Sequence, residues 1–278
     1  MKYYSNAKIN LGLQILKKRS DGFHDLESIF VELDFHDKLI FSNSSKFFIQ
    51  SNSKEIPLDE NNTVSQAYNI LKKLYTPKRD YSIFIEKKIP LGSGLGGGSS
   101  NAATTIKALN LLWGLHLTEK KLLEISSKIG SDVPFFINGK SQFVEGRGEK
   151  LSSINSSKIN DYIFLLVLPK FSISTKWAFS KLNIKKNPLF TNDTFNKFCS
   201  QSEELDWKFF KNDFEEMINQ TYPEIGIIKK TLIANGALYA SLSGSGSTMF
   251  GVFDNYLDAE KTSFLLNEYN TVITRPHK

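Results

Sequence analysis

The chain has 278 residues, of which 40% are hydrophobic and 23% charged, a composition typical of a globular protein that excludes a disordered one. No apolar run approaches the length of a membrane span, and the single cysteine, Cys199, is expected to be a spectator thiol in a cytoplasmic protein without a secretory signal. The net charge of +6 comes mostly from scattered lysines, which fits a small phosphorylated ligand and gives little support to nucleic-acid binding.

The first half of the chain is expected to begin with strands, because apolar and polar residues alternate over much of the first fifty residues. Helices are then expected over residues 63–75, 99–112 and 118–130, with a strand between the first two at residues 81–90. Asn62 can cap the first of these helices and Gly130 can end the third.

In the second half, the polar, Ser-rich stretch 152–158 is the expected linker. Strands are expected over residues 162–169, on both sides of a Gly/Ser turn within 237–253, and over 271–275, and helices over 175–182, 203–220, 223–235 and 256–268. This mixture of blocks predicts an α+β fold with two lobes, an N-terminal one over 1–155 and a C-terminal one over 156–278.

The most informative stretch is the glycine run "PLGSGLGGGSS" over residues 90–100, between an expected strand and an expected helix. Such a loop presents backbone N–H groups and a helix N-terminus to phosphate, and Ser99 and Ser100 add hydroxyl donors. A Walker loop is excluded because no lysine follows the glycines. The spacing G-x-G-x-x-G does occur, but it lacks the alternating strand–helix context of a dinucleotide-binding fold. The alternative without a ligand is that the run is only a flexible hinge or a glycine-rich turn.

Three further segments carry polar residues with two readings each. Lys8 and Asn10 are two apart on an expected strand and so share one face, although a strand lysine is most often a solvated edge charge. Asp132, in "GSDVPFF", is either a reactive carboxylate or the N-cap of a short helix. The turn at Gly244 in "SLSGSGSTMF" could be only a hairpin loop.

Together these segments resemble the GHMP kinases, which phosphorylate small-molecule hydroxyls with ATP. The resemblance rests on "AKINLGLQIL" with "RSDGFHDLESIF", "PLGSGLGGGSSNAATTIKALN", "GSDVPFF" with "EGRGE", and "SGSGSTMF", and it is weakest over residues 180–235. It implies a two-lobed fold with the active site in the cleft between an ATP-binding N-terminal lobe and a C-terminal lobe. Within the superfamily, the motifs are most similar to the branch that phosphorylates a hydroxyl of 4-diphosphocytidyl-2-C-methyl-D-erythritol in non-mevalonate isoprenoid biosynthesis.

The resemblance also implies residue roles. Lys8 would lie beside the acceptor hydroxyl and Asp132 would accept its proton. The ATP phosphates would be held by Pro90, Leu91, Gly92, Ser93, Gly94, Leu95, Gly96, Gly97, Gly98, Ser99 and Ser100. The substrate would be contacted by Asn10, Phe23, His24, Lys87, Thr175, Phe179 and Gly244, with the cytosine ring between the Phe23–His24 segment and Phe179. Phe23 departs from the tyrosine that is frequent at this position in the family.

ATP with Mg²⁺ is the expected cofactor pair, the metal being held mainly by the nucleotide, and no protein metal site is expected. The expected partners are ATP and the cytidine-diphosphate substrate, and a homodimer is compatible with this interpretation. The alternatives are another GHMP kinase acting on a mevalonate-type or sugar substrate, a non-catalytic protein of the same fold that only binds ligand, and a nicotinamide-binding oxidoreductase.

Overall fold

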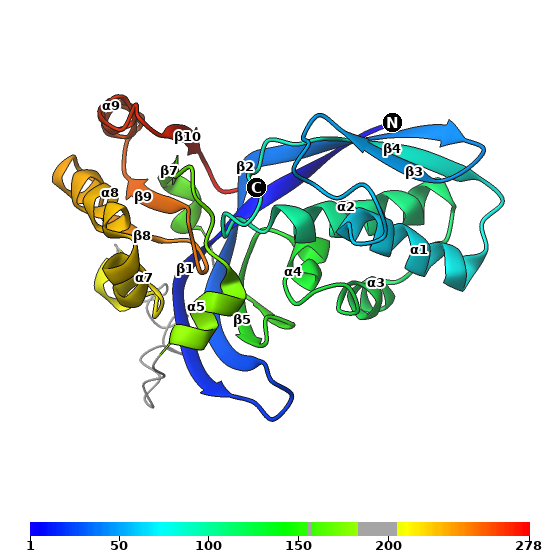
Figure 1. The fold of residues 1–278 in the computed structure, drawn as a ribbon, viewed down its shortest axis with the longest axis horizontal. Coiled ribbons are helices and arrows are strands. Elements are labelled where there is room, and N and C mark those ends of the chain that lie inside the picture. The colour runs from blue at the N-terminus through cyan, green and yellow to red at the C-terminus, as the bar shows by residue number, and fades with distance from the viewer. Residues whose placement is uncertain (155–156, 183–204) are drawn as a thin grey trace. The chain divides into compact units, whose positions relative to one another are not determined.

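The computed structural model describes residues 1–154, 157–182 and 205–278, and Cys199 lies outside these ranges (Figure 1). Contacts within the chain divide it into two compact units. Unit 1 comprises residues 1–7, 35–91 and 96–139, and unit 2 comprises residues 8–34, 92–95 and 140–278. These units interleave along the chain, unlike a single division after residue 155.

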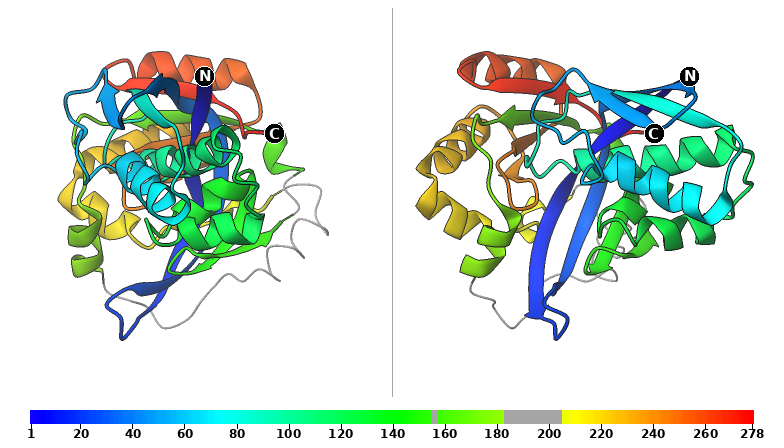
Figure 2. Two further views of the ribbon diagram at one scale, coloured as in Figure 1. Left: turned by 90° about the vertical axis from the view of Figure 1, so that its right-hand side faces the viewer. Right: turned by 45° about the vertical axis from the view of Figure 1, so that its right-hand side comes forward.

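The interleaving arises from two long strands, β1 (Lys2–Lys18) and β2 (His24–Ser44), which form a hairpin and contribute residues to both units. Figure 2 shows the two strands running side by side along their length. The hairpin belongs to a six-stranded sheet in the order β3-β4-β2-β5-β6, with β1 also paired to β2.

Unit 1 packs helices along one side of its strands, as Figure 1 shows. Its elements after the hairpin are β3 (Phe48–Ser51), α1 (Thr63–Tyr75), β4 (Asp80–Glu86), α2 (Gly97–Leu112), α3 (Glu119–Ser126) and α4 (Val133–Asn138). The predicted cap of α1 is confirmed, because the Asn62 side chain accepts a hydrogen bond from Val64 N at 2.9 Å. Helix α3 begins after Thr118 as expected but ends at Ser126, four residues before Gly130.

Unit 2 contains the strands β5 (Ser141–Gly146) and β6 (Lys150–Ser153) and a second, four-stranded sheet in the order β10-β7-β9-β8. The remaining elements are η1 (Ile159–Asp161), β7 (Ile163–Leu168), α5 (Thr175–Lys181), η2 (Trp207–Phe209), α7 (Glu215–Thr221), α8 (Pro223–Ala234), β8 (Tyr239–Leu242), β9 (Met249–Phe253), α9 (Tyr256–Leu265) and β10 (Asn270–Thr274). Strands β7, β8, β9 and β10 lie where strands were expected, and every residue of β7, β8 and β9 is buried. Strands β5 and β6 were not predicted. The start of the expected linker, however, lies inside β6.

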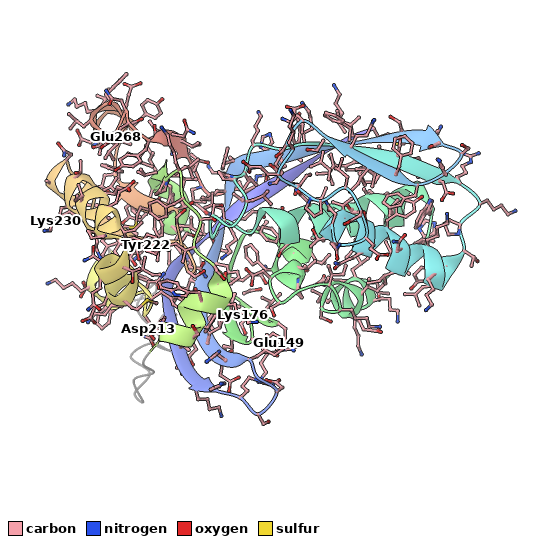
Figure 3. The ribbon with its side chains drawn as sticks, viewed as in Figure 1. Glu149, Lys176, Asp213, Tyr222, Lys230 and Glu268 are labelled. Carbon is pink, nitrogen blue, oxygen red and sulfur yellow. The ribbon has the colours of Figure 1, made fainter. Side chains whose placement is uncertain are left out.

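The core of unit 2 joins the hairpin to the second sheet. Leu13 and Ile15 of β1 pack in one buried cluster with Leu165 of β7 and Leu232 of α8. Asp213, labelled in Figure 3, lies two residues before the start of α7. Its carboxylate accepts a hydrogen bond from Ile15 N at 2.8 Å. The part of β1 that carries the predicted site residues is therefore fixed to the rest of unit 2.

Candidate functional site

The glycine run has the backbone that its sequence predicts. Gly92, Gly94 and Gly96 all adopt left-handed conformations, with φ of 60°, 79° and 70°. Side-chain-bearing residues rarely adopt this region, so three glycines in alternation allow a tightly curled loop. The run is therefore a specifically shaped turn, and helix α2 begins directly after Gly96.

Within unit 2, the loop at Gly94 packs against the second Gly/Ser turn. A Cβ on Gly94 would lie 2.0 Å from the carbonyl oxygen of Ser243. The Ser243 hydroxyl donates to Gly94 O at 3.0 Å, and Thr248 N donates to Ser93 O at 3.2 Å. Two segments that are about 150 residues apart in the chain are thus hydrogen-bonded to each other, which spacing in the sequence alone could not reveal.

Helix α2 begins without a side-chain cap, since its N-cap is Gly96. The N-terminus of such a helix has backbone N–H groups that lack partners within the helix and attract anions. Ser100 in the first turn is buried and accepts a hydrogen bond from the Ser5 hydroxyl at 2.8 Å. A Cβ on Gly97 would lie 2.9 Å from Ile89 Cγ2 and from Lys87 Nζ, so this glycine is required for close packing beneath the helix.

Lys8 and Asn10 lie on one face of β1, as their spacing predicts. The Lys8 ammonium donates to Asn10 Oδ1 at 2.6 Å and lies 4.5 Å from the centre of the Phe30 ring. Lys8 is only 3% exposed, which excludes the solvated edge charge. Asn10 Nδ2 in turn donates to the Ser28 hydroxyl at 3.0 Å. The ammonium is therefore held in a fixed position.

The second turn reaches this pair of residues. A Cβ on Gly244 would lie 3.5 Å from Asn10 Oδ1 and 3.6 Å from Gly94 Cα. Unit 2 thus brings together Asn10, Gly94 and Gly244, three of the predicted site residues. Thr175 lies at the edge of the same turn, with its hydroxyl 3.0 Å from that of Ser245.

Asp132 belongs to unit 1, where it immediately precedes the short helix α4. It occupies the N-cap position, but its side chain makes no capping hydrogen bond to the helix. The other end of α4 is held by Lys107 of α2, whose ammonium donates to Phe136 O at 2.9 Å. The geometry of α4 therefore gives no support to the interpretation of Asp132 as a helix cap.

Of the aromatic residues predicted to bind the base, His24 and Phe179 contact each other. The rings of His24 and Phe179 are stacked, with centroids 4.6 Å apart, and Phe179 also packs edge-on against Phe214 at 4.9 Å. Phe23 is 48% exposed, and the Arg147 guanidinium lies 4.8 Å from its ring centre. Phe179 thus faces His24 in this structure, and the ring of Phe23 remains open to a ligand.

Lys87 lies in unit 1, three residues before the glycine run begins at Pro90. Its ammonium is buried and donates to Asp37 Oδ2 and to Ile89 O, each at 2.6 Å. Burial lowers the pKa of Lys87, and the ion pair with Asp37 opposes this shift. The Lys87 ammonium is therefore part of an internal ion pair, and its contact with substrate stays a prediction.

Two features of the site were missed from the sequence. A cavity of about 320 Å³ in unit 1 is lined by Ser53, Lys54, Glu55, Lys87, Lys88, Ile89, Pro90 and Leu91, so it is continuous with the start of the glycine run. In unit 2, Asn212 Nδ2 donates to Leu242 O at 2.7 Å and Gly244 O at 2.8 Å, which fixes the second turn. Neither feature has a local motif, since each depends on segments that are distant in the chain.

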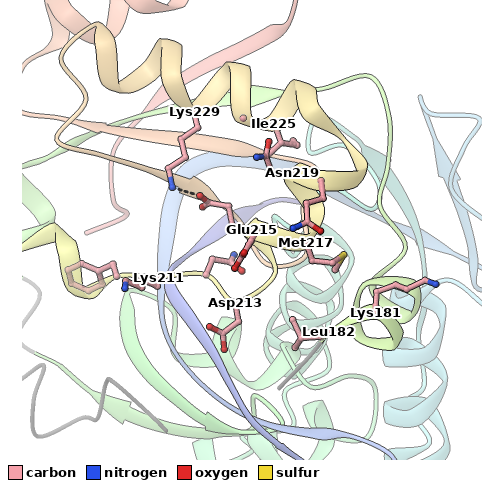
Figure 4. A pocket seen from close by; sticks show the side chains of 14 residues that line it. Lys181, Leu182, Lys211, Asp213, Glu215, Met217, Asn219, Ile225 and Lys229 are labelled. Atoms are coloured by element: carbon pink, nitrogen blue, oxygen red, sulfur yellow. Dashed lines mark hydrogen bonds and ion pairs between the residues drawn. The ribbon is translucent and has the colours of Figure 1, made fainter. Parts of the chain in front are cut away.

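A larger cavity of about 770 Å³ lies in unit 2, and Figure 4 shows the side chains around it. Its described lining includes three lysines and three carboxylates, and one pair of these, Lys229 with Glu215, forms an ion pair. Its charges are balanced, so the lining does not favour a diphosphate. Asn212 is part of the wall.

The described residues contain neither a metal-binding cluster nor a membrane-spanning helix. No group of three or more His, Cys, Asp or Glu side chains there is arranged to hold a metal ion. Among the helices of residues 1–154, 157–182 and 205–278, none is both long and apolar enough to cross a bilayer.

Comparisons with known proteins identify the family of the chain. The family model "GHMP kinases N terminal domain" matches residues 62–140, and "GHMP kinases C terminal" matches residues 189–268. A protein of Thermodesulfovibrio yellowstonii named 4-diphosphocytidyl-2-C-methyl-D-erythritol kinase is 44% identical over 261 residues, which cover 92% of this chain and 90% of that protein. A protein of the same name from Clostridioides difficile is 40% identical over 262 residues, covering 92% of this chain and 87% of the relative.

Solved structures show the same fold. The crystal structure of a 4-(cytidine 5'-diphospho)-2C-methyl-D-erythritol kinase matches all of both chains with a TM-score of 0.84 at 24% identity. The mevalonate kinase of Methanococcus jannaschii matches 100% of this chain and 98% of its own with a TM-score of 0.74 at 16% identity. The fold is therefore the α+β fold of the GHMP kinases. Given the 44% identical relative, the chain belongs to the GHMP kinases and, within them, to the 4-diphosphocytidyl-2-C-methyl-D-erythritol kinase family.

Proposed function

We propose that the protein transfers the γ-phosphoryl group of ATP to a hydroxyl of 4-diphosphocytidyl-2-C-methyl-D-erythritol, giving the 2-phosphate and ADP. One observation carries this proposal: the two glycine turns at Gly94 and Gly244 pack together beside the fixed Lys8–Asn10 pair. A phosphate-binding loop next to a buried cation is the arrangement that phosphoryl transfer requires. The names of the relatives supply the identity of the acceptor.

The nucleotide is proposed to bind along the glycine run. Its phosphates lie over residues 90–100, where the left-handed glycines leave room and the N-terminus of α2 favours negative charge. Its nucleoside occupies the 320 Å³ cavity that Pro90 and Leu91 share with residues 53–55. Mg²⁺ bound with ATP would supply neutralisation of phosphate charge and would be held mainly by oxygens of the nucleotide.

Lys8 and Asp132 are proposed to act on the reacting groups. The acceptor oxygen attacks the γ-phosphorus, the bond from that phosphorus to the β–γ bridging oxygen breaks, and ADP leaves with the electron pair. Asp132 takes the proton of the hydroxyl, for which its carboxylate must be ionised. The Lys8 ammonium, aimed by Asn10 Oδ1, stabilises the negative charge on the transferring group.

The cytidine end is proposed to bind at Phe23 and His24. The exposed Phe23 ring offers a stacking face, and the Arg147 guanidinium above it adds positive charge near the diphosphate. Because His24 and Phe179 already contact each other, a base between them would require their rings to separate. We therefore place the base on Phe23, with His24 at its edge.

An assay of ADP release tests this proposal. The purified protein with MgATP is given 4-diphosphocytidyl-2-C-methyl-D-erythritol, mevalonate or homoserine, and the initial rates are compared. We expect turnover only with the cytidine-diphosphate substrate. Turnover with mevalonate or homoserine instead would favour another GHMP activity, and ATP binding without turnover on any acceptor would favour the non-catalytic alternative.

A further inference from the structure

Asp37 of β2 is a fully buried carboxylate, with 0% of its surface exposed, and it was not among the predicted site residues. It accepts four hydrogen bonds within unit 1. Its Oδ1 accepts from Lys88 N at 2.7 Å and from Ile89 N at 2.8 Å, and its Oδ2 accepts from Lys87 Nζ at 2.6 Å and Asn101 Nδ2 at 2.9 Å. A buried carboxylate is tolerated only when it is paired and fully hydrogen-bonded, and Asp37 meets both conditions.

The donors to Asp37 come from the two ends of the glycine run. Lys88 and Ile89 immediately precede Pro90, and Asn101 lies at the start of α2, directly after Ser100. One side chain therefore holds both the segment that enters the run and the helix that follows it.

The surrounding contacts strengthen this attachment. Lys87 makes a second bond, to Ile89 O at 2.6 Å, and Asn101 Nδ2 also donates to the Ser5 hydroxyl at 2.8 Å. A Cβ on Gly97 would lie 2.9 Å from Lys87 Nζ, which shows how closely the ion pair packs beneath the start of α2. The lysine thus supplies both the counter-charge for Asp37 and a support for the helix.

We propose that Asp37 is a positioning residue that fixes the two ends of the glycine run and so preorganises its N–H groups for the phosphates of ATP. This inference rests on the proposed nucleotide-binding role of the run. Asp37 is itself inaccessible to a ligand, so its effect on ATP passes through the residues of its four hydrogen-bond donors. Without it, the loop must be ordered when ATP binds, and that ordering weakens affinity.

Binding measurements on Asp37→Asn test the proposal. Asparagine retains the size of the side chain but removes the charge opposite Lys87 and replaces one acceptor oxygen by a donor. We expect the Kd for ATP to rise about tenfold, while the Kd for the cytidine-diphosphate substrate stays within twofold of wild type. Hydrogen exchange of the amides over residues 92–100 should become faster in the free variant and slow again when ATP is added.

The matched control is Asp80→Asn, in the same unit. Asp80 also pairs with a lysine, accepting from Lys72 at 2.7 Å and from the Tyr68 hydroxyl at 2.8 Å, but it joins β4 to α1. We expect this variant to lower Tm and to leave the Kd for ATP unchanged. If Asp37→Asn behaves in the same way, Asp37 is only a structural carboxylate and the proposal is overturned.

Asn101→Ala provides a second route if Asp37→Asn fails to fold. It releases only the α2 end and leaves the Asp37–Lys87 pair intact, so we expect a severalfold higher Kd for ATP in a folded protein. An unchanged Kd in folded Asn101→Ala also overturns the proposal. Failure of the proposed nucleotide-binding role of the run has a different signature, because the wild-type protein would then bind no ATP.

Discussion

The Cα of Gly94 faces the carbonyl oxygen of Ser243 so closely that a Cβ at this position would lie 2.0 Å from that oxygen. The φ of Gly94 is also +79°, so both space and backbone conformation require glycine here. The contact joins the phosphate-loop candidate to the second Gly/Ser turn. A substitution in one of these two turns therefore affects the other turn as well.

Gly94→Ala should weaken ATP binding, because the added methyl group must push the two turns apart. We expect a rise of about tenfold or more in the Kd for ATP, measured by calorimetry. The control is Gly114→Ala, where φ is +62° but the nearest atom to a Cβ is His116 Nε2 at 4.0 Å. This control carries the same backbone strain without the collision, so it should lose only about 1 kcal/mol of stability. An unchanged ATP Kd in Gly94→Ala would mean that the run is only a hinge.

Local rules predicted those parts of the fold that depend on neighbours in the chain. The left-handed glycines, the Asn62 cap and the shared face of Lys8 and Asn10 all follow from spacing and backbone preference. Gly97 is an intermediate case. The sequence indicates that glycine is needed, and the packing against Ile89 adds a reason that the sequence did not show, the lack of space for a side chain beneath the helix.

The features that the sequence could not reveal all join distant segments. Asp37 is separated by 64 residues from Asn101, and Asn212 by 32 from Gly244, and neither pair has a motif. The two interleaved units have the same origin, because β2 is a single strand from His24 to Ser44 and contributes residues to both. The role of Lys87 at the substrate was predicted from the resemblance alone, and its buried ion pair with Asp37, 50 residues away, has no motif either.

Asp132→Asn should reduce kcat by about 10²–10⁴-fold and leave ATP binding intact, because asparagine retains the shape of the side chain but cannot accept the proton of the hydroxyl. Single-turnover kinetics with saturating ATP would measure the loss. Asp206→Asn is a suitable control, since Asp206 is a true cap whose Oδ1 accepts from Lys208 N at 3.1 Å. The control should retain kcat. A variant of Asp132 with normal kcat and a lower Tm would show that capping is its role after all.

Phe23→Ala should weaken binding of the cytidine-diphosphate substrate by about 1–3 kcal/mol, as removal of a base-stacking ring weakens binding at nucleic-acid sites. Phe23→Tyr should bind as well as wild type, because it keeps the stacking face. The Kd of the substrate would be measured in the presence of a non-hydrolysable ATP analogue. Phe264→Ala removes a ring of α9 that is 71% exposed and should change nothing. An equal loss of affinity for ATP and for the substrate in Phe23→Ala would argue against a specific contact between Phe23 and the base.

The ring of His24 should titrate below its usual pKa of about 6.5, first because burial disfavours its charged form and second because Lys18 repels it. A lowered pKa in the folded state means that the unfolded chain binds the proton more tightly. The contribution of His24 to stability is therefore complete above about pH 6.5 and declines as the pH falls from there through the lower folded pKa.

NMR titration of the four histidines measures this shift, with His24→Gln used to assign the signal. Phe179→Ala removes the ring that stacks on His24 at 4.6 Å, so the pKa should rise back toward 6.5. Lys18→Gln should raise it by a smaller amount, because repulsion is the lesser of the two causes. If His24 titrates at 6.5 or above, or if Phe179→Ala leaves its pKa unchanged, the stacked pair does not persist in solution. The ring of Phe179 would then be free to close over the base from the side opposite Phe23.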